Sequence, residues 1–200
     1  LYEDYEIETV ADEIAAVLDV LEVRQATVFG YSMGGMVAQA LARRHPGLVG
    51  RAVYAATAAK PMRRPVVDAI GMVLLRVLWK VGNLEGARLS HAVLRHAGAY
   101  GPEHDRWLWD VMLARDTELN MRALRAIKRF DSRKWVSQVP APVLVIIPTR
   151  DQIIPPGHQY ELAGLVKDHV VLELGGRHEA IFTHAAHIAE AVVEFVEKAQ

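Results

Sequence analysis

The chain has 200 residues, of which 52% are hydrophobic, and its 24 acidic side chains nearly balance 23 basic ones. This length and apolar content predict one compact domain with a sizeable core. The near-neutral charge gives no electrostatic reason to expect nucleic acid or an anionic membrane surface as a partner. Asp68, Arg76 and Lys80 interrupt the longest apolar run, 66–81, so the sequence predicts no membrane span.

The sequence contains no cysteine, which excludes disulfides and thiolate metal sites and is compatible with the cytoplasmic location that we expect. Its histidines and carboxylates show no metal-ligand spacing, and no glycine-rich phosphate-binding motif is present, so we expect no cofactor. The first residue is Leu1, and the polar stretch 2–8 resembles no signal peptide. We therefore expect that some upstream sequence is missing.

Hydrophobic periodicity predicts alternating helices and strands in the first part of the chain. Residues 9–21 have the spacing of an amphipathic helix, with Thr9 as its cap and Asp12 completing a capping box. Residues 26–29 predict a short strand buried on both faces, and residues 33–44 predict a second helix. Residues 51–55 predict another buried strand. The order strand, helix, strand implies a parallel pair with a right-handed crossover.

Residues 60–136 lack a convincing strand and carry the four tryptophans on helical stretches, which predicts an inserted helical cap. The α/β pattern then resumes with strands at 143–147 and 170–174, and with helices at 159–165 and 185–198. The sequence thus predicts an α/β fold with a mostly parallel sheet flanked by helices. Its segments are a first part of the core (1–59), the cap (60–136) and a second part of the core (137–200).

Gly30-Tyr31-Ser32-Met33-Gly34 matches the G-x-S-x-G nucleophile elbow between a predicted strand and a predicted helix. Such a turn is tight, and we expect both glycines to be needed for close backbone approach. Ser32 would lie at a helix N-terminus, where the dipole favours negative charge and the Met33 amide can bind an oxyanion. An incidental serine in a glycine-rich turn is the alternative, but the strand-turn-helix context favours a nucleophile.

A serine nucleophile needs a histidine to take its proton and an acid to orient that histidine. Asp151 directly follows the strand at 143–147, at the sheet edge where Ser32 is expected. An aspartate that only closes a turn or caps a helix is the alternative interpretation. The other position at which an acid could follow a strand, 56–59, contains no carboxylate.

Among nine histidines, His178 alone follows the last predicted strand through a glycine pair, Gly175-Gly176, so we predict that it is the base. His184 is the second candidate, although it and His187 fit the first turn or the surface of the final helix better. The remaining histidines are expected to face solvent, and those in the cap include His91, His96 and His104.

These segments resemble the α/β-hydrolase superfamily through Gly30-Tyr31-Ser32-Met33-Gly34-Gly35, Thr149-Arg150-Asp151 and Gly176-Arg177-His178. The resemblance spans nearly the whole chain and implies a parallel sheet with a cap and a Ser-Asp-His triad. Family members have further strands before the first helix, and one of the following loops supplies a second oxyanion amide. Neither is present here. We therefore expect an exposed apolar edge on the first strand, and weak or no ester hydrolysis by these residues alone.

The resemblance implies a serine hydrolase that cleaves a carboxylic ester of a small, hydrophobic substrate through an acyl-enzyme. The cap contributes apolar residues to a predicted pocket: Val66, Val67, Ile70, Val73, Leu74, Val77 and Trp79. Lactonases, carbon-carbon bond hydrolases and haloperoxidase-like enzymes use similar triads, and the sequence does not separate these chemistries. The alternative function is a non-catalytic protein that binds an apolar small ligand under the cap.

Overall fold

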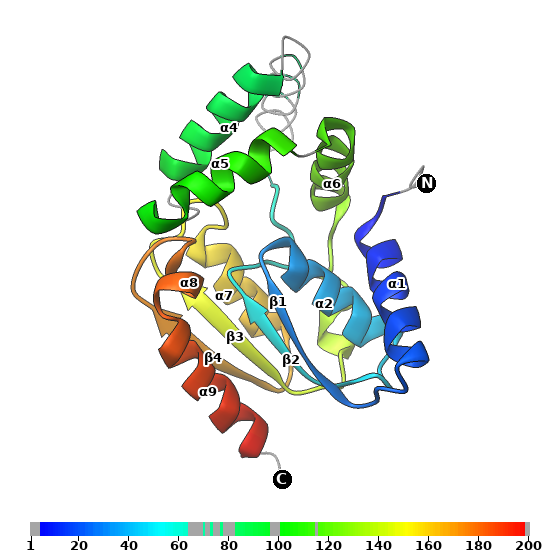
Figure 1. Ribbon diagram of the computed structural model, residues 1–200. Coiled ribbons are helices and arrows are strands. Elements are labelled where there is room, and N and C mark those ends of the chain that lie inside the picture. Colours follow the sequence, from blue (N-terminus) through cyan, green and yellow to red (C-terminus); the bar gives the residue numbers. More distant parts are fainter. Residues whose placement is uncertain are drawn as a thin grey trace.

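The structure is a computed structural model that describes residues 5–63, 70, 73, 77, 83–96, 101–114 and 116–198. The predicted alternation of helices and strands is present on both sides of the cap region (Figure 1). In chain order the elements are α1 Ile7–Val20, β1 Ala26–Tyr31, α2 Met33–Arg44, β2 Val49–Ala55, α4 Asn83–His96, η1 Pro102–His104, α5 Asp105–Ala114, α6 Thr117–Arg129, η2 Val136–Gln138, β3 Val143–Pro148, α7 Pro156–Leu165, β4 His169–Leu174, α8 Ala180–Thr183 and α9 Ala185–Glu197.

Within the described residues, the sheet has four strands in the order β1-β2-β3-β4. All neighbouring pairs are parallel, with Phe29 opposite Val53, Val53 opposite Leu144 and Leu144 opposite Val170. The carboxyl ends of all these strands therefore lie at one edge, above which Figure 1 shows α4 and α5. The predicted α/β fold with a parallel sheet is confirmed.

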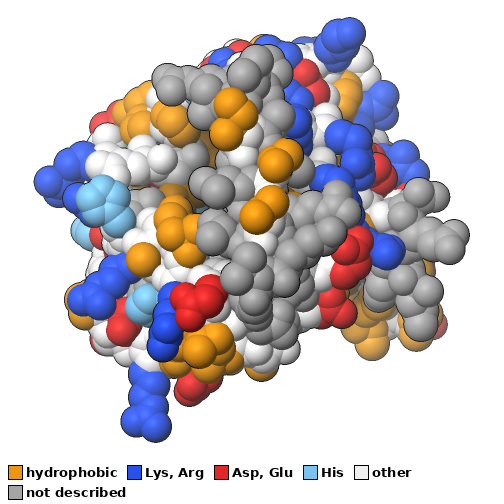
Figure 2. All heavy atoms as spheres, turned by 90° about the horizontal axis from the view of Figure 1, so that it is seen from above, with side chains coloured by type: hydrophobic (Ala, Val, Ile, Leu, Met, Phe, Trp, Pro, Cys, Tyr) orange, Lys and Arg blue, Asp and Glu red, His pale blue; other side chains and the backbone are white. Residues whose placement is uncertain are grey.

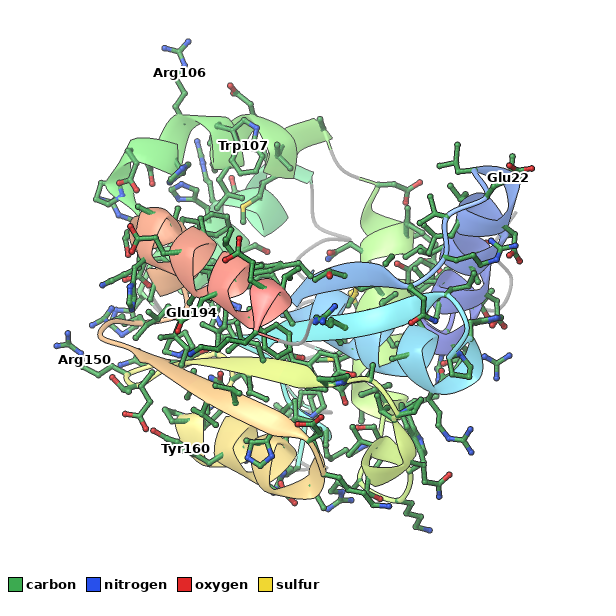
Figure 3. All side chains as sticks on the ribbon, turned by 90° about the horizontal axis from the view of Figure 1, so that it is seen from below. Glu22, Arg106, Trp107, Arg150, Tyr160 and Glu194 are labelled. Carbon is green, nitrogen blue, oxygen red and sulfur yellow. The ribbon has the colours of Figure 1, made fainter. Side chains whose placement is uncertain are left out.

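Side chains of the central strands alternate between two helical layers, as the period of two in a strand requires. Tyr54 and Val145 belong to the core shared with α1, α2 and α7. Val53 and Leu144 belong to the core on the opposite face, under α8 and α9. Figure 3 views the molecule from below and shows α9 on one side of the sheet and α7 on the other. Both faces of β2 and β3 are thus covered, which explains their continuous apolar sequences.

The strand β1 differs from the prediction of burial on both faces. It lies at the edge of the described sheet, and Phe29 remains 45% exposed. A four-residue apolar run is the same for a central strand and an edge strand, so it could not reveal the strand order. The exposed apolar edge that the family resemblance implied is present in the structure.

The start of α1 also corrects the sequence analysis. The helix begins at Ile7 with Glu6 as its N-cap, and no side chain caps it, so Thr9 lies inside the helix. Asp12 does not complete a capping box; it accepts hydrogen bonds from Arg44 and pairs with His45 at the end of α2. The predicted capping box of α1 is absent because Asp12 pairs with residues on another helix. Local spacing in the sequence does not reveal such partners.

In the predicted cap, the described segments 83–96, 102–114 and 117–129 are helical. The helices α4 and α5 share a small apolar cluster centred on Ala87 and Met112. The two ends of the segment meet at Lys60, whose Nζ donates to the carbonyls of Lys128 (2.9 Å) and Phe130 (3.1 Å). The boundary of the cap stays a prediction. None of the helices in the described residues is both long and apolar enough to span a membrane.

Candidate active site

Ser32 occupies the sharp turn between β1 and α2. Its backbone has φ 53° and ψ −117°, in a region that non-glycine residues rarely adopt. Its N–H donates to the carbonyl of Ala55 (2.9 Å), and its own carbonyl accepts from the N–H of Gly35 (3.0 Å). A conformation of this kind costs about 1–3 kcal/mol and persists only where the surroundings enforce it. The predicted strained elbow is therefore present at Ser32.

The glycines around Ser32 have different steric roles. A Cβ on Gly30 would lie 2.3 Å from the carbonyl oxygen of Gly34, and one on Gly35 would lie 2.5 Å from Cγ2 of Thr57. A Cβ on Gly34 would meet no atom within 4 Å. The expectation that Gly34 needs to lack a side chain is therefore wrong. The close approach is that of Gly30 to the backbone of Gly34, while the packing of α2 on Thr57 depends on Gly35.

Asp151 and His178 meet at the carboxyl edge of the sheet, although they follow different strands, β3 and β4. Oδ2 of Asp151 lies 2.7 Å from Nδ1 of His178, and the two side chains are 0% and 5% exposed, respectively. A carboxylate on Nδ1 favours the tautomer with the proton on that nitrogen, which leaves Nε2 as an acceptor. A histidine with a free Nε2 can take a proton from a hydroxyl group.

Further hydrogen bonds hold the Asp151 carboxylate in place. Its Oδ1 accepts from the backbone N–H groups of Ile153 (2.8 Å) and Ile154 (3.0 Å), and its Oδ2 accepts from Nε2 of Gln159 (3.0 Å). The aspartate thus closes its own turn, as the alternative interpretation held, and it also contacts His178. The sequence analysis missed Gln159, because one glutamine in the first turn of a helix matches no motif.

Ser32 follows Tyr31, a residue that contacts His178 directly. Tyr31, the residue before Ser32, has its ring centroid 5.0 Å from that of His178, and its hydroxyl donates to the His178 carbonyl (3.4 Å). In the described part of the chain, no hydrogen bond links the Ser32 hydroxyl to the imidazole. Catalytic hydrogen bonds are often long in free enzymes and shorten when substrate binds.

Aromatic rings cover one side of the site. Tyr31 contacts Phe182 edge-to-face at 5.4 Å, and Phe182 lies 5.8 Å from the ring of His104. Burial, followed by the negative charges of Asp151 and Glu179, raises the pKa of Tyr31 well above its ordinary value. Tyr31 therefore stays neutral and acts as a hydrogen-bond donor beside His178.

A cavity of about 340 Å³ lies between the cap helices and the loop that carries His178. Arg177 crosses between these parts, since its Nη1 donates to the carbonyl of His96 at the end of α4 (2.9 Å). The cavity is lined by Arg95, Gly101, Pro102, Glu103, Asp105, Arg177, Glu179 and Thr183. Six of these eight residues have a charged or polar side chain, and Figure 2 shows both signs of charge interspersed on the cap side.

Three of the cap residues expected to line an apolar pocket lie within the described residues. Ile70, Val73 and Val77 are each more than half exposed, so they do not form a closed apolar wall. The other residues of that prediction lie outside the described residues: Val66, Val67, Leu74 and Trp79. A second cavity, of about 360 Å³, lies away from His178 and is lined by Glu8, Ala40, Arg43, Arg44 and Trp135.

The other histidines differ in how well they match the predictions. His184 is at the junction of α8 and α9, and its Nδ1 lies 3.2 Å from the Ala180 carbonyl, so it serves the helix ends. His91 was expected to face solvent, but its side chain is 15% exposed and its ring packs edge-to-face on Trp109. Helix α4 turns this residue toward α5, a tertiary contact that the sequence did not reveal. Among the described residues, no group of His, Asp and Glu could hold a metal ion.

A sequence model of the alpha/beta hydrolase fold matches residues 2–185 of the chain. The chain belongs to the α/β-hydrolase fold family. This α/β-hydrolase is 27% identical over 199 residues to a pimeloyl-[acyl-carrier protein] methyl ester esterase from Neisseria meningitidis, covering 96% of this chain and 76% of that protein. It is 28% identical over 212 residues to a 2-hydroxymuconate semialdehyde hydrolase from a Pseudomonas species, covering 94% of this chain and 68% of that protein.

Among solved structures, the α/β-hydrolase is similar to the enol-lactonase from Burkholderia xenovorans LB400. The TM-score is 0.83 at 26% identity, covering 96% of this chain and 74% of the lactonase. An esterase from Exiguobacterium antarcticum matches with a TM-score of 0.84 at 16% identity, over 98% of this chain and 76% of the esterase, and this likeness concerns the fold alone. The named relatives are all hydrolytic enzymes, and their names describe different bonds.

Proposed function

We propose that this α/β-hydrolase cleaves carboxylic esters, with Ser32 as nucleophile, His178 as general base and Asp151 as the acid that orients His178. One observation carries the proposal. A buried carboxylate is hydrogen-bonded to Nδ1 of His178 at 2.7 Å, at the sheet edge where Ser32 occupies a strained strand-to-helix turn. This set of groups supports acyl transfer, because a hydroxyl, an imidazole and a carboxylate are the three groups that nucleophilic catalysis by serine requires.

In the proposed reaction, Ser32 Oγ attacks the ester carbonyl while Nε2 of His178 accepts the hydroxyl proton. The backbone N–H of Met33, at the start of α2, stabilises the oxyanion together with the helix dipole. The imidazolium gives its proton to the leaving alcohol, and Ser32 keeps the acyl group. Water then attacks the acyl-enzyme with His178 again as base, which releases the acid and restores Ser32.

The proposed substrate is a small ester with a hydrophobic acyl or alcohol group. The rings of Tyr31 and Phe182 support this choice, since they give the imidazole an apolar neighbour on one side. Ester chemistry is preferred to carbon-carbon bond cleavage because the esterase and the enol-lactonase are named for ester and lactone bonds. A cytoplasmic location stays a prediction.

A fluorophosphonate probe tests the proposal, because it labels only an activated serine. We expect the full-length wild-type protein to be labelled. In the same full-length protein, Ser32→Ala should lose both labelling and p-nitrophenyl butyrate hydrolysis, the latter by at least about 10³-fold. Circular dichroism would confirm that the variant is folded. Unchanged labelling of Ser32→Ala would assign the nucleophile to another residue. A folded, full-length protein that the probe does not label would instead favour the alternative, a non-catalytic binder of apolar ligands.

A further inference from the structure

Gln159 is a fully buried glutamine in the first turns of α7, with 0% of its surface exposed. The next residue, Tyr160, lies on the outer side of the same helix and is 42% exposed (Figure 3). Its hydroxyl donates to Glu173 on β4 at 2.7 Å. Helix α7 thus directs Gln159 inward, toward the loop that carries Asp151, while its neighbour remains at the surface.

The amide of Gln159 is fixed by two acceptors. Its Nε2 donates to Oδ2 of Asp151 (3.0 Å) and to the carbonyl of Ile154 (2.7 Å). A flipped amide would place Oε1 against both of these oxygens, so only this orientation is compatible with the contacts. Within the described part of the chain, the buried Oε1 has no hydrogen-bond partner. A buried carbonyl oxygen without a hydrogen-bond partner is unfavourable in a core. The two hydrogen bonds that Nε2 donates therefore explain why a glutamine is present at this position.

We propose that Gln159 is a positioning residue that holds the Asp151 carboxylate in its rotamer and moderates the basicity of His178. The inference rests on the proposed function, because it takes Asp151 and His178 as the acid and base of the site. Oδ2 of Asp151 accepts from both Gln159 and His178. Each donor draws negative charge from that oxygen, so the amide weakens the stabilisation that Asp151 gives to a protonated imidazole. Loss of this amide should therefore strengthen the interaction between Asp151 and a protonated imidazole.

Several other charged or titratable groups lie near His178, and they are the same in the wild-type protein and in a Gln159 variant. Asp151 faces it from the loop after β3, and Tyr31 faces it from β1. Arg177 and Glu179 flank it in its own loop, and Arg177 donates to the carbonyl of His96. Arg150 points away from the molecule (Figure 3). None of these is changed when Gln159 alone is replaced, so a change in the titration of His178 reports the amide.

The test is an NMR titration of His178 in the wild-type protein, in Gln159→Met and in Gln39→Met. Gln39 is a matched control, because it is also 0% exposed and hydrogen-bonded, to Ser132 at 2.6 Å, but lies on α2. We expect Gln159→Met to raise the pKa of His178 by about 0.5–1 unit. We expect Gln39→Met to change it by less than about 0.2 unit. Thermal unfolding of both variants measures how far each substitution destabilises the core. This effect can then be separated from the change in the titration of His178.

An unmoved or lowered pKa of His178 in folded Gln159→Met, or an equal rise in Gln39→Met, would overturn the inference. Gln159→Leu replaces Gln159→Met if the latter does not fold. The same wild-type spectra give an independent readout: the side-chain amide protons of Gln159 are expected to shift with the midpoint of His178, and an amide that does not follow it contradicts the proposal. Fluorophosphonate labelling tests the hydrolase function separately, since the titration needs no turnover.

Discussion

Two aspartate-histidine pairs in this protein have the same separation but different surroundings. Asp151 and His178 lie 2.7 Å apart at the carboxyl edge of the sheet, with side chains 0% and 5% exposed. Asp12 and His45 also lie 2.7 Å apart, where α1 meets the end of α2, with side chains 41% and 31% exposed. Ser32 is the N-cap of α2 and His45 is its C-cap, so the two pairs lie at opposite ends of that helix.

Distance alone therefore does not distinguish the proposed catalytic pair from a surface ion pair. Asp12 also accepts from Nε and Nη2 of Arg44, so its charge is already balanced, and these hydrogen bonds lower its pKa to about 2. His45 uses Nε2 for the contact, whereas His178 uses Nδ1 and keeps Nε2 for a substrate or a nucleophile. The Asp151–His178 pair differs from this surface ion pair in three ways. It is buried, it uses Nδ1 of the histidine, and it lies at the sheet edge that carries the strained turn at Ser32.

The largest expected difference between the pairs is in activity. Asp151→Asn is expected to lower kcat/KM for p-nitrophenyl butyrate by about 10⁴-fold, because an asparagine amide can donate to Nδ1 and so favours the wrong tautomer of His178. Asp12→Asn should change kcat/KM by less than about 2-fold, because surface pairs distant from a site act independently of it. Steady-state kinetics of both variants measure this contrast, and similar losses in the two would contradict it.

The contrast between the two aspartate-histidine pairs also depends on a rigid turn at Ser32. Two alanine substitutions test the rigidity of this turn. Gly30→Ala would place a Cβ 2.3 Å from the backbone oxygen of Gly34, so it is expected to lower the free energy of unfolding by about 2–3 kcal/mol. Gly34→Ala is the matched control: nothing lies within 4 Å of its Cβ, and the change should stay within about 1 kcal/mol. Urea denaturation at pH 7 measures both, and equal destabilisation would count against this account of the turn.

The smallest expected effect is the contribution of Asp12 to stability. Its pKa is lowered from 3.8 to about 2, first by Arg44 and then by His45. A lowered pKa means that the stabilisation is present above the ordinary value and disappears as the pH falls through 2. Because the side chain is 41% exposed, solvent screening should keep the loss in Asp12→Asn below about 1 kcal/mol at pH 7.

Urea midpoints of the wild-type protein and Asp12→Asn, measured between pH 2 and pH 7, check this prediction. The two proteins should differ at neutral pH and converge near pH 2, and 1 M salt should reduce the difference at pH 7. A difference that persists unchanged at pH 2 would mean that Asp12 contributes through packing rather than charge.

Much of the site could be predicted because its signals are local or follow from topology. The turn at Ser32 needs a glycine at position 30 and a strand before a helix, and both are visible in sequence. Parallel strands bring their carboxyl ends to one edge, so the loops after β3 and β4 were the correct places to seek Asp151 and His178. What could not be predicted was that Gln159 shares an oxygen with His178, or that Asp12 binds α2 rather than capping α1.

By itself, the sequence determined the elements and the chemistry available to them, because hydrophobic period, glycine positions and residue type act within one strand, turn or helix. Only the tertiary structure decided which of these groups meet. His178 reaches Asp151 across 27 positions, and Ser132 reaches Gln39 across 93, and no local pattern specifies such contacts. Strand order and burial fix them, since these set which side chains lose water together and which must then satisfy each other's hydrogen bonds.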